Sequence, residues 1–334
     1  MKNTELAAER KSPIEIIRRY SVIFTAIVLI VIAVIMTQGT FLSLGNLLNV
    51  GERAAAIGIV AIGQMLVILT GNIDLSVSGI MAVSLASAAA FIKMETIPFP
   101  VVIILMLVIG MGCGALNGLV ISRTRIPSFM FTLGTYLVYQ SIGYVISRAQ
   151  NMNFKPLQAW MNPSGTMDGR IFAIILWLAL GILFILILSF TRFGKNIYAT
   201  GASKRAATMS GVKGNQIIFL AYTICGLMCA LSAWTMEYRL GQMNVNSTSS
   251  YQIESIASVV VGGVSMNGGE GKAYGPLVGA FIMAALLNLL NLYGVGVYEQ
   301  NVVKGLVLIG FVALSSFLTS SSKGATKKKK VKAA

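Results

Sequence analysis

The chain alternates long apolar runs with short polar or glycine-rich breaks along almost its whole length. A helix that crosses a bilayer needs about 20 mostly apolar residues, and most of these runs approach that length. The pattern therefore predicts an all-α polytopic membrane protein with about ten transmembrane helices. We place them at residues 20–37, 52–70, 75–92, 98–121, 127–147, 171–190, 215–238, 251–265, 276–292 and 300–318.

Composition favours one membrane domain over a soluble enzyme. Of the 334 residues, 56% are hydrophobic and only 11% are charged, whereas charged residues make up about a quarter of an average soluble domain. About ten helices of about 20 residues each leave only short loops, with no room for a large catalytic domain outside the membrane. Small residues such as Gly110, Gly114 and Gly118 let helix backbones approach one another, which predicts a packed bundle.

Lys and Arg are distributed unevenly over alternate loops, and this predicts the orientation. The chain holds 26 of them. With a cytoplasmic N-terminus, the other side keeps only Arg53, Lys93, Arg148, Lys155, Arg170, Arg239 and Lys304. Cytoplasmic loops carry an excess of Lys and Arg. We therefore expect both termini in the cytoplasm, with a cytoplasmic segment at 1–19, a transmembrane domain at 20–318 and a basic cytoplasmic tail at 319–334.

The formal net charge of +15 is thereby explained without nucleic acid. A nucleic-acid-binding protein gathers its cations on one soluble face, and the sequence predicts no such face. The run Lys327–Lys330 is instead typical of a solvated tail attracted to the lipid surface. We expect the lipid bilayer, and no nucleic acid, to surround this chain.

Residue types that carry catalysis are scarce. The chain has no His, which removes the commonest general base and the usual zinc ligand. Cys225 and Cys229 have no further thiol or imidazole near them in sequence, so we interpret them as packing residues. Lys272 is followed by Ala273, so the glycine-rich stretch 262–271 is not a P-loop. We expect no catalytic residue, metal or cofactor here, and any use of ATP requires a separate polypeptide.

Several acidic side chains lie within or beside apolar runs, where ionisable groups are costly and so are functional candidates. Asp74 lies in a helix break after Asn72, and Glu254 lies early in another predicted helix. Each either caps its helix or lies beside a transported polar solute. Glu52 and Glu299 begin predicted helices, where a carboxylate complements the helix dipole, so we expect them to be caps.

Neutral hydrogen-bonding groups accompany these acids. Asn117, Asn288 and Asn291 place amides on apolar helices, and Thr132 and Tyr136 place hydroxyls on another. Such groups either join helices by hydrogen bonds or line a path. Neutral groups beside aromatic rings suit a polyol better than an ion.

The longest basic internal loop is 191–214, which contains Arg192, Lys195, Lys204, Arg205 and Lys213. Its stretch 202–210 can form about two helical turns outside the membrane. A positive-inside loop explains the charge. A short helix on the cytoplasmic face would also let a transporter receive motion from a separate motor.

Six motifs occur in order between about residues 40 and 315. They are Thr-Gly-Asn-Ile-Asp-Leu-Ser-Val at 70–77, Leu-Asn-Gly-Leu-Val-Ile at 116–121, Ile-Pro-Ser-Phe-Met-Phe-Thr-Leu-Gly-Thr at 126–135, Thr-Arg-Phe-Gly-Lys-Asn-Ile-Tyr-Ala-Thr-Gly at 191–201, Ser-Gly-Val at 210–212, and the glycine-rich stretch 256–279. Their order and spacing resemble the permease subunits of bacterial ABC importers for ribose, galactose and similar monosaccharides. Asn72 and Leu289 depart from the usual pattern, so the sugar itself stays open.

The resemblance implies a multi-pass permease of the bacterial cytoplasmic (inner) membrane that imports a monosaccharide or a related small polar solute. It implies as partners a cytoplasmic ATP-binding cassette ATPase that holds ATP and Mg²⁺, an extracytoplasmic sugar-binding protein, and a second permease copy or close paralogue. The expected substrate path comprises Asn72, Asp74, Asn117, Phe129, Thr132, Tyr136, Glu254, Asn288 and Asn291. The loop 191–214 is expected to dock on the ATPase through Gly201, Ala202, Ser203, Lys204, Arg205, Ala206, Ala207, Ser210 and Gly211.

Two other classes of protein are possible on the sequence alone. A secondary transporter or channel that works alone needs an ion-coupling site or a selectivity ring, for which acid-poor spans without His offer little material. A membrane-embedded transferase needs clustered acids or a phosphate site, and the sequence contains neither pattern.

Overall fold

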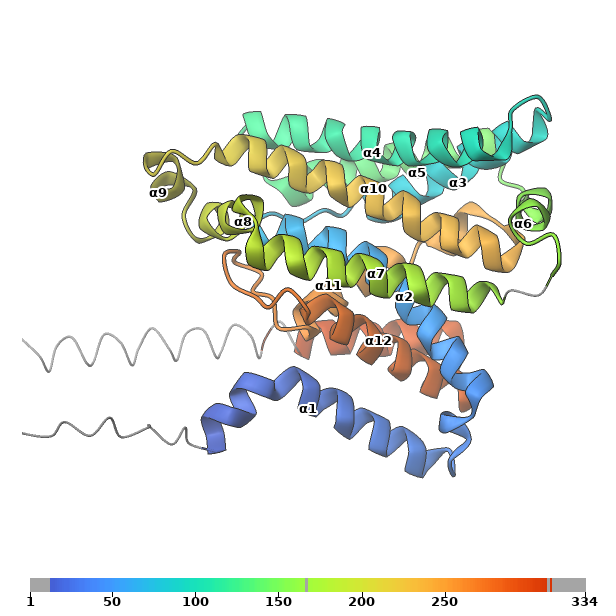
Figure 1. The fold of residues 1–334 in the computed structure, drawn as a ribbon, viewed down its shortest axis with the longest axis horizontal. Coiled ribbons are helices and arrows are strands. Elements are labelled where there is room, and N and C mark those ends of the chain that lie inside the picture. The colour runs from blue at the N-terminus through green and yellow to red at the C-terminus, as the bar shows by residue number, and fades with distance from the viewer. Residues whose placement is uncertain (1–12, 166–167, 311–312, 314–334) are drawn as a thin grey trace, which may run out of the picture.

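The computed structural model describes residues 13–165, 168–310 and 313, in which long helices lie side by side (Figure 1). Residues 1–12, the end of the tenth predicted helix and the tail 319–334 lie outside the described residues. The helices are α1 Pro13–Met36, α2 Leu44–Leu69, α3 Val77–Lys93, α4 Phe99–Arg123, α5 Ser128–Ser147, α6 Lys155–Met161, α7 Gly169–Phe190, α8 Arg192–Ala202, α9 Lys204–Met209, α10 Gly214–Leu240, α11 Tyr251–Val261 and α12 Gly275–Leu292. Residues 297–310 are also helical.

Short elements complete the fold. The 3₁₀ helices η1 (Thr40–Leu42) and η2 (Val245–Thr248) precede α2 and α11. Strands β1 (Met152–Asn153) and β2 (Gln242–Met243) pair antiparallel. They tie the segment after α5 to the segment after α10.

Six described helices, α2, α4, α5, α7, α10 and α12, are long and apolar enough to cross a membrane. Residues 22–36 of α1 and helix α3 are apolar but shorter. The 11 residues of α11 extend only about 16 Å, against a hydrocarbon core of about 30 Å. The helical, multi-span prediction is confirmed, and the number of about ten crossings stays a prediction.

The start of α2 differs from the prediction. The sequence placed it at residue 52, whereas the helix begins at Leu44. Glu52 and Arg53 therefore lie inside the helix, and the expectation that Glu52 caps its start is wrong. Asn46 and Asn49 make the sequence before residue 52 too polar to be recognised as part of an apolar span. In the structure both lie in the helix and line a polar pocket.

Glycines let α10 pack closely against α4. A Cβ added at Gly114 would lie 2.3 Å from the carbonyl oxygen of Tyr222, and one at Gly118 would lie 2.8 Å from that of Phe219. No side chain fits at such distances, so these positions need glycine. The predicted small-residue contacts are therefore present.

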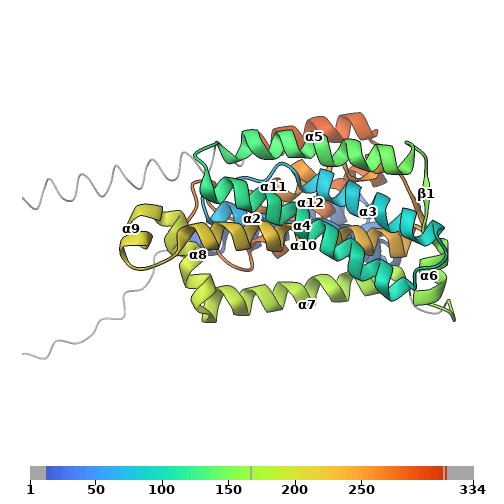
Figure 2. The ribbon, with the colours of Figure 1, turned by 90° about the horizontal axis from the view of Figure 1, so that it is seen from above.

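The bundle has two distinct ends (Figure 1). One carries α8 and α9, the beginning of α1 and the 262–275 turn, since the Tyr198 hydroxyl donates to the carbonyl of Gly271 at 3.0 Å. The other carries α6 and the strands, with Lys93 and Arg148 around one hollow. Figure 2 shows α9 projecting from the first end, beyond the long helices.

Two of the cations counted on the outer side contact a buried acid. Arg53 lies in α2, and Lys304 lies in the helix 297–310 with only 6% of its surface exposed. Both contact Glu254. The predicted helices 52–70 and 300–318 already contain these residues, but their shared contact with a buried acid from a distant segment was not predicted.

The helices α3 and α11 begin against each other inside the bundle. The Ser78 hydroxyl accepts from the amide of Gln252 at 2.9 Å, and the Thr248 hydroxyl donates to the carbonyl of Ser78 at 3.1 Å. From this junction α3 runs to Lys93 at the α6 end, and α11 runs to the turn at the α8–α9 end. The two short helices therefore point in opposite directions.

Candidate functional site

Polar groups gather at both helix starts, and the start of α3 is the more enclosed. Asp74 is fully buried, and its Oδ1 accepts from the amide of Ser76 at 2.8 Å and from its hydroxyl at 2.6 Å. Ser76 is the N-cap residue of α3. Asp74 is therefore not the N-cap residue, but it holds the N-cap residue Ser76 in place.

Three neighbouring helices hold this start in place. The side-chain amide of Asn117 on α4 donates to the Ser76 hydroxyl at 2.8 Å, and the Tyr139 hydroxyl on α5 donates to the side-chain oxygen Oδ1 of Asn117 at 3.2 Å. Tyr222 of α10 donates to the carbonyl of Ile73 at 3.2 Å. We call the segment 70–76 and these partners the sealed break, because the backbone of Ile73 and the amide of Leu75 bond with side chains of α5 and α10.

The other predicted path residues of this region lie around the sealed break. Thr132 is buried and accepts from the amide of Leu75 at 3.0 Å. The Asn72 amide donates to the Thr70 hydroxyl at 3.0 Å. Phe129 is 46% exposed and Tyr136 is partly exposed, both on α5.

The start of α11 opens instead into a cavity of about 510 Å³, which we call the Glu254 pocket. It lies between α2, η2, α11 and the end of α12, and Asn46 and Asn291 place it toward the α6 end of the bundle. Its lining residues are Asn46, Asn49, Glu52, Arg53, Ser247, Ser250, Tyr251, Glu254, Asn288, Asn291 and Leu292. Three predicted path residues, Glu254, Asn288 and Asn291, are thus brought together.

Two cations converge on the acid of this pocket. Lys304 Nζ lies 2.6 Å from Glu254 Oε1, and an Arg53 guanidinium nitrogen lies 3.8 Å from the same oxygen. Glu254 is 1% exposed. Breaking such a buried pair by removing one partner leaves an uncompensated charge, which is strongly destabilising.

Amides surround these charges. Asn288 donates to Asn46 Oδ1 at 2.9 Å, and Gln300 donates to Asn291 Oδ1 at 2.7 Å. The side-chain oxygen Oδ1 of Asn288 is buried and accepts no hydrogen bond from any described residue. Asn49 and Asn291 are exposed, so the pocket passes from an open rim to a buried base.

Sequence reasoning missed Asn46, Asn49 and Arg53 as members of this pocket, and Lys304 as a partner of its acid. The predicted helix began at residue 52, after both asparagines, and the two cations were counted only as charges of the outer side. A helical spacing between Asn46, Asn49 and Arg53 was the available signal, since residues three or four apart share one helix face.

The basic loop forms two helices. The predicted short helix is present as α9, capped by Ser203, whose hydroxyl accepts from the amide of Ala206 at 3.2 Å. Helix α8 was not predicted. On α9, Lys204 and Arg205 are exposed, and Met209 is 83% exposed. An exposed methionine on a projecting helix is an adaptable contact surface.

Glycine joins this loop to the bundle. A Cβ on Gly201 would lie 1.8 Å from the carbonyl oxygen of Leu69, at the end of α2. The amide of Gly269 donates to that same carbonyl at 2.9 Å, and a Cβ on Gly269 would lie 2.5 Å from the amide of Ala202. We call these contacts the glycine joint. It links α8 to the end of α2, directly before the sealed break, and to the 262–275 turn.

Burial raises the pKa of Tyr198 on α8. The phenol therefore stays protonated over a wider pH range, and it keeps donating to the carbonyl of Gly271. This bond is a second link between the loop and the turn.

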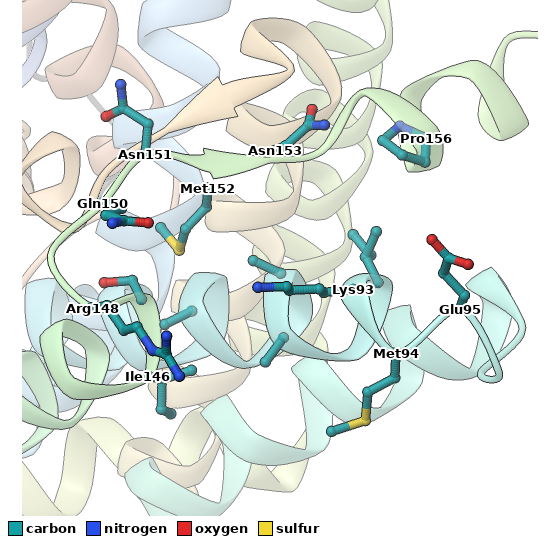
Figure 3. A pocket seen from close by; sticks show the side chains of 15 residues that line it. Lys93, Met94, Glu95, Ile146, Arg148, Gln150, Asn151, Met152, Asn153 and Pro156 are labelled. Carbon is teal, nitrogen blue, oxygen red and sulfur yellow. The ribbon is translucent and has the colours of Figure 1, made fainter.

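A second hollow of about 620 Å³ lies at the opposite end. Figure 3 shows residues 150–153 passing over the side chains of Lys93 and Arg148 in that view. Glu95, Arg148 and Ala149 beside it have φ values of 56°, 53° and 55°, a left-handed conformation that non-glycine residues seldom adopt. The surface around this hollow is therefore held in an unusual backbone shape.

The chain is similar in sequence to known permease proteins. Residues 46–312 match the family described as "Branched-chain amino acid transport system / permease component". The chain is 35% identical over 298 residues to the ribose import permease protein of Bacillus subtilis (strain 168), covering 87% of this chain and 91% of that one. It is 31% identical over 311 residues to the galactose/methyl galactoside import permease protein of Escherichia coli (strain K12), covering 87% and 92%.

A third relative is the fructose import permease protein of Rhizobium meliloti. It is 30% identical over 292 residues, which cover 85% of this chain and 81% of the relative. No solved structure matches the chain.

Proposed function

This chain belongs to the branched-chain amino acid transport system / permease component family, and from that premise we propose that it forms the membrane path for a monosaccharide in an ATP-driven importer. The observation that carries the proposal is the match, over more than four-fifths of this chain, to import permeases for ribose, fructose and galactose. Such a subunit moves a solute and makes or breaks no bond.

The proposed topology has about ten crossings in the bacterial inner membrane and both termini in the cytoplasm. The α8–α9 end is the cytoplasmic one, since it carries Arg192, Lys195, Lys204, Arg205, Lys213 and Lys272.

The proposed motor is a separate ATPase that binds ATP and Mg²⁺ and docks on residues 201–211. Support comes from the exposed, capped helix α9 and from the glycine joint behind it. Because backbones touch at this joint, a displacement of α9 moves the end of α2 and the 262–275 turn with little slack. ATP binding and hydrolysis would thereby favour one of two arrangements of the bundle.

The proposed path includes both groups of polar residues. Asn72, Asp74, Asn117, Phe129, Thr132 and Tyr136 surround the sealed break, and Glu254, Asn288 and Asn291 line the open pocket. Exposed amides at the pocket rim are costly against lipid. A second permease copy, identical or paralogous, would cover them and complete the path.

The proposed extracytoplasmic sugar-binding protein docks at the α6 end. Both the Glu254 pocket and the hollow beside Lys93 and Arg148 lie toward this end. A binding protein placed there releases its sugar near the open pocket.

Uptake in cells tests this function. Cells that carry the chain with its genomic neighbours should accumulate D-ribose, D-fructose or D-galactose, and deletion of the chain should abolish the accumulation. Reversal of charge by Lys204→Glu with Arg205→Glu should separate ATP hydrolysis from sugar uptake. Uptake that persists without the chain contradicts the proposal.

A further inference from the structure

The charges of the Glu254 pocket balance one another. Glu52, Glu254 and Arg53 line the pocket, and the buried Lys304 pairs with Glu254, so two acids accompany two bases and both bases contact the same Glu254 oxygen. We propose that this pocket is a binding site, within the permease itself, for a neutral polyhydroxyl solute, and that it rejects zwitterionic amino acids. The solute class rests on the proposed function; the site and the rejection go beyond it.

The rejection follows from how the cations are used. The carboxylate of an amino acid needs a cation, but Lys304 lies 2.6 Å from Glu254 and is 6% exposed. Arg53, which lines the pocket, is the more exposed base, but its guanidinium lies 3.8 Å from the same Glu254 oxygen. A ligand carboxylate that recruits either base therefore competes with Glu254 for it. Separating a buried pair is unfavourable, so an amino acid gains little here. A neutral solute leaves the pair intact.

The amides match hydroxyl groups. Each asparagine side chain both donates and accepts hydrogen bonds, as each sugar hydroxyl does. The buried side-chain oxygen Oδ1 of Asn288 receives no hydrogen bond from the described residues, although the same side chain donates to Asn46. A buried acceptor without a donor is unfavourable, and a solute hydroxyl supplies the missing donor.

The remaining walls suit a small ring. The cavity of about 510 Å³ falls within the usual range for small-molecule sites. Tyr251 lines it and is partly buried. An aromatic ring offers an apolar face to the C–H groups of a sugar. The combination of amides, balanced charge and one aromatic ring is suited to a saccharide.

Protection of an added cysteine tests the site in the full chain. Ser250→Cys places a thiol on the pocket wall, and Ser147→Cys places a matched thiol in the hollow at Lys93. The labelling rate with a small methanethiosulfonate is measured in membranes, against the chain without the added thiol. We expect D-ribose, D-fructose or D-galactose, at ten times its dissociation constant, to slow labelling of Ser250→Cys about tenfold. Ser147→Cys should be unaffected, and L-leucine should protect neither thiol.

A second variant identifies the binding group. Adding Asn288→Leu to Ser250→Cys should weaken protection about tenfold, because it removes both the donor and the acceptor. Asn267→Leu, exposed at the other end, should change nothing. Protection by L-leucine, or equal protection after Asn288→Leu, overturns the site.

Uptake in cells separates this site from the proposed function. If no sugar protects Ser250→Cys while uptake still depends on the chain, the site is wrong and the importer function stands. If a sugar protects but the chain supports no uptake, the importer function fails and the site stands.

Discussion

The starts of α3 and α11 lie against each other, yet their polar groups are used differently. Asp74 Oδ1 accepts two bonds from Ser76, while its buried Oδ2 accepts none from the described residues. Helices α4, α5 and α10 enclose the sealed break and contribute hydrogen bonds to it or to its partners. Glu254 instead pairs with two cations beside an open cavity. The difference indicates two roles for an acid at a helix start within a bundle. An acid enclosed by neighbouring helices stabilises the fold, and an acid beside a cavity can also contact a solute.

The largest expected effect is at the open start. Glu254→Leu leaves Lys304 and Arg53 without their shared acid, so the free energy of unfolding should fall by about 3–5 kcal/mol. Thermal unfolding of the purified chain in detergent measures this. Adding Lys304→Met to Glu254→Leu should recover part of the loss. An unchanged melting temperature for Glu254→Leu would show that the ion pair contributes nothing to the fold.

The sealed break should respond with a smaller loss. Asp74→Ala removes the acceptor of two bonds from Ser76, which should cost about 2–3 kcal/mol. Asp74→Asn keeps one acceptor oxygen and should keep most of the stability, while its loss of negative charge should lower uptake more than insertion. Insertion and unfolding assays on both variants test this. Equal loss of stability in Asn and Ala would contradict the cap geometry.

The glycine joint comes next in size. Gly201→Ala forces a Cβ into the end of α2 and should destabilise by about 1–3 kcal/mol. Its effect on sugar uptake should exceed its effect on folding, because the joint connects α8 to the end of α2, directly before the sealed break, and to the turn after α11. Gly112→Ala is the control, since no atom of the described residues outside its own helix lies within 4 Å of the added Cβ. Equal uptake by the two variants would remove the joint from the transmission of motion.

The smallest effect on stability is expected on α9. Lys204→Glu with Arg205→Glu alters only exposed side chains, so the free energy of unfolding should change by no more than about 0.5 kcal/mol. ATP hydrolysis stimulated by sugar should nevertheless fall, because the docking surface has changed its charge. Hydrolysis measured in the assembled importer, with Lys213→Glu for comparison, tests whether α9 is the docking helix.

Much of the architecture could be predicted from the sequence because lipid leaves a strong signal. Apolar length predicted most long helices within a few residues, and small residues predicted close packing of helices, which α4 and α10 show. The same rule failed at α2, where Asn46 and Asn49 face a pocket rather than lipid. Apolar length measures lipid contact, so it cannot recognise a helix face that turns toward water or solute.

The candidate site was harder to predict because its members meet only in three dimensions. Glu254 and Lys304 are separated by a turn and by the whole of α12, and Arg53 lies near the other end of the sequence. When the sequence shows no nearby partner for a charged residue in an apolar run, that residue is interpreted as the end of a helix. Asp74 was easier, because its partner Ser76 lies within the same motif.

The most direct test of the importer function is sugar uptake into vesicles that contain the permease. The binding protein is placed outside and the ATPase with ATP and Mg²⁺ inside, and radiolabelled D-ribose, D-fructose and D-galactose are supplied in turn. The account predicts that at least one sugar accumulates above its external concentration, and only while ATP is hydrolysed. Accumulation driven by an ion gradient without the ATPase would contradict it.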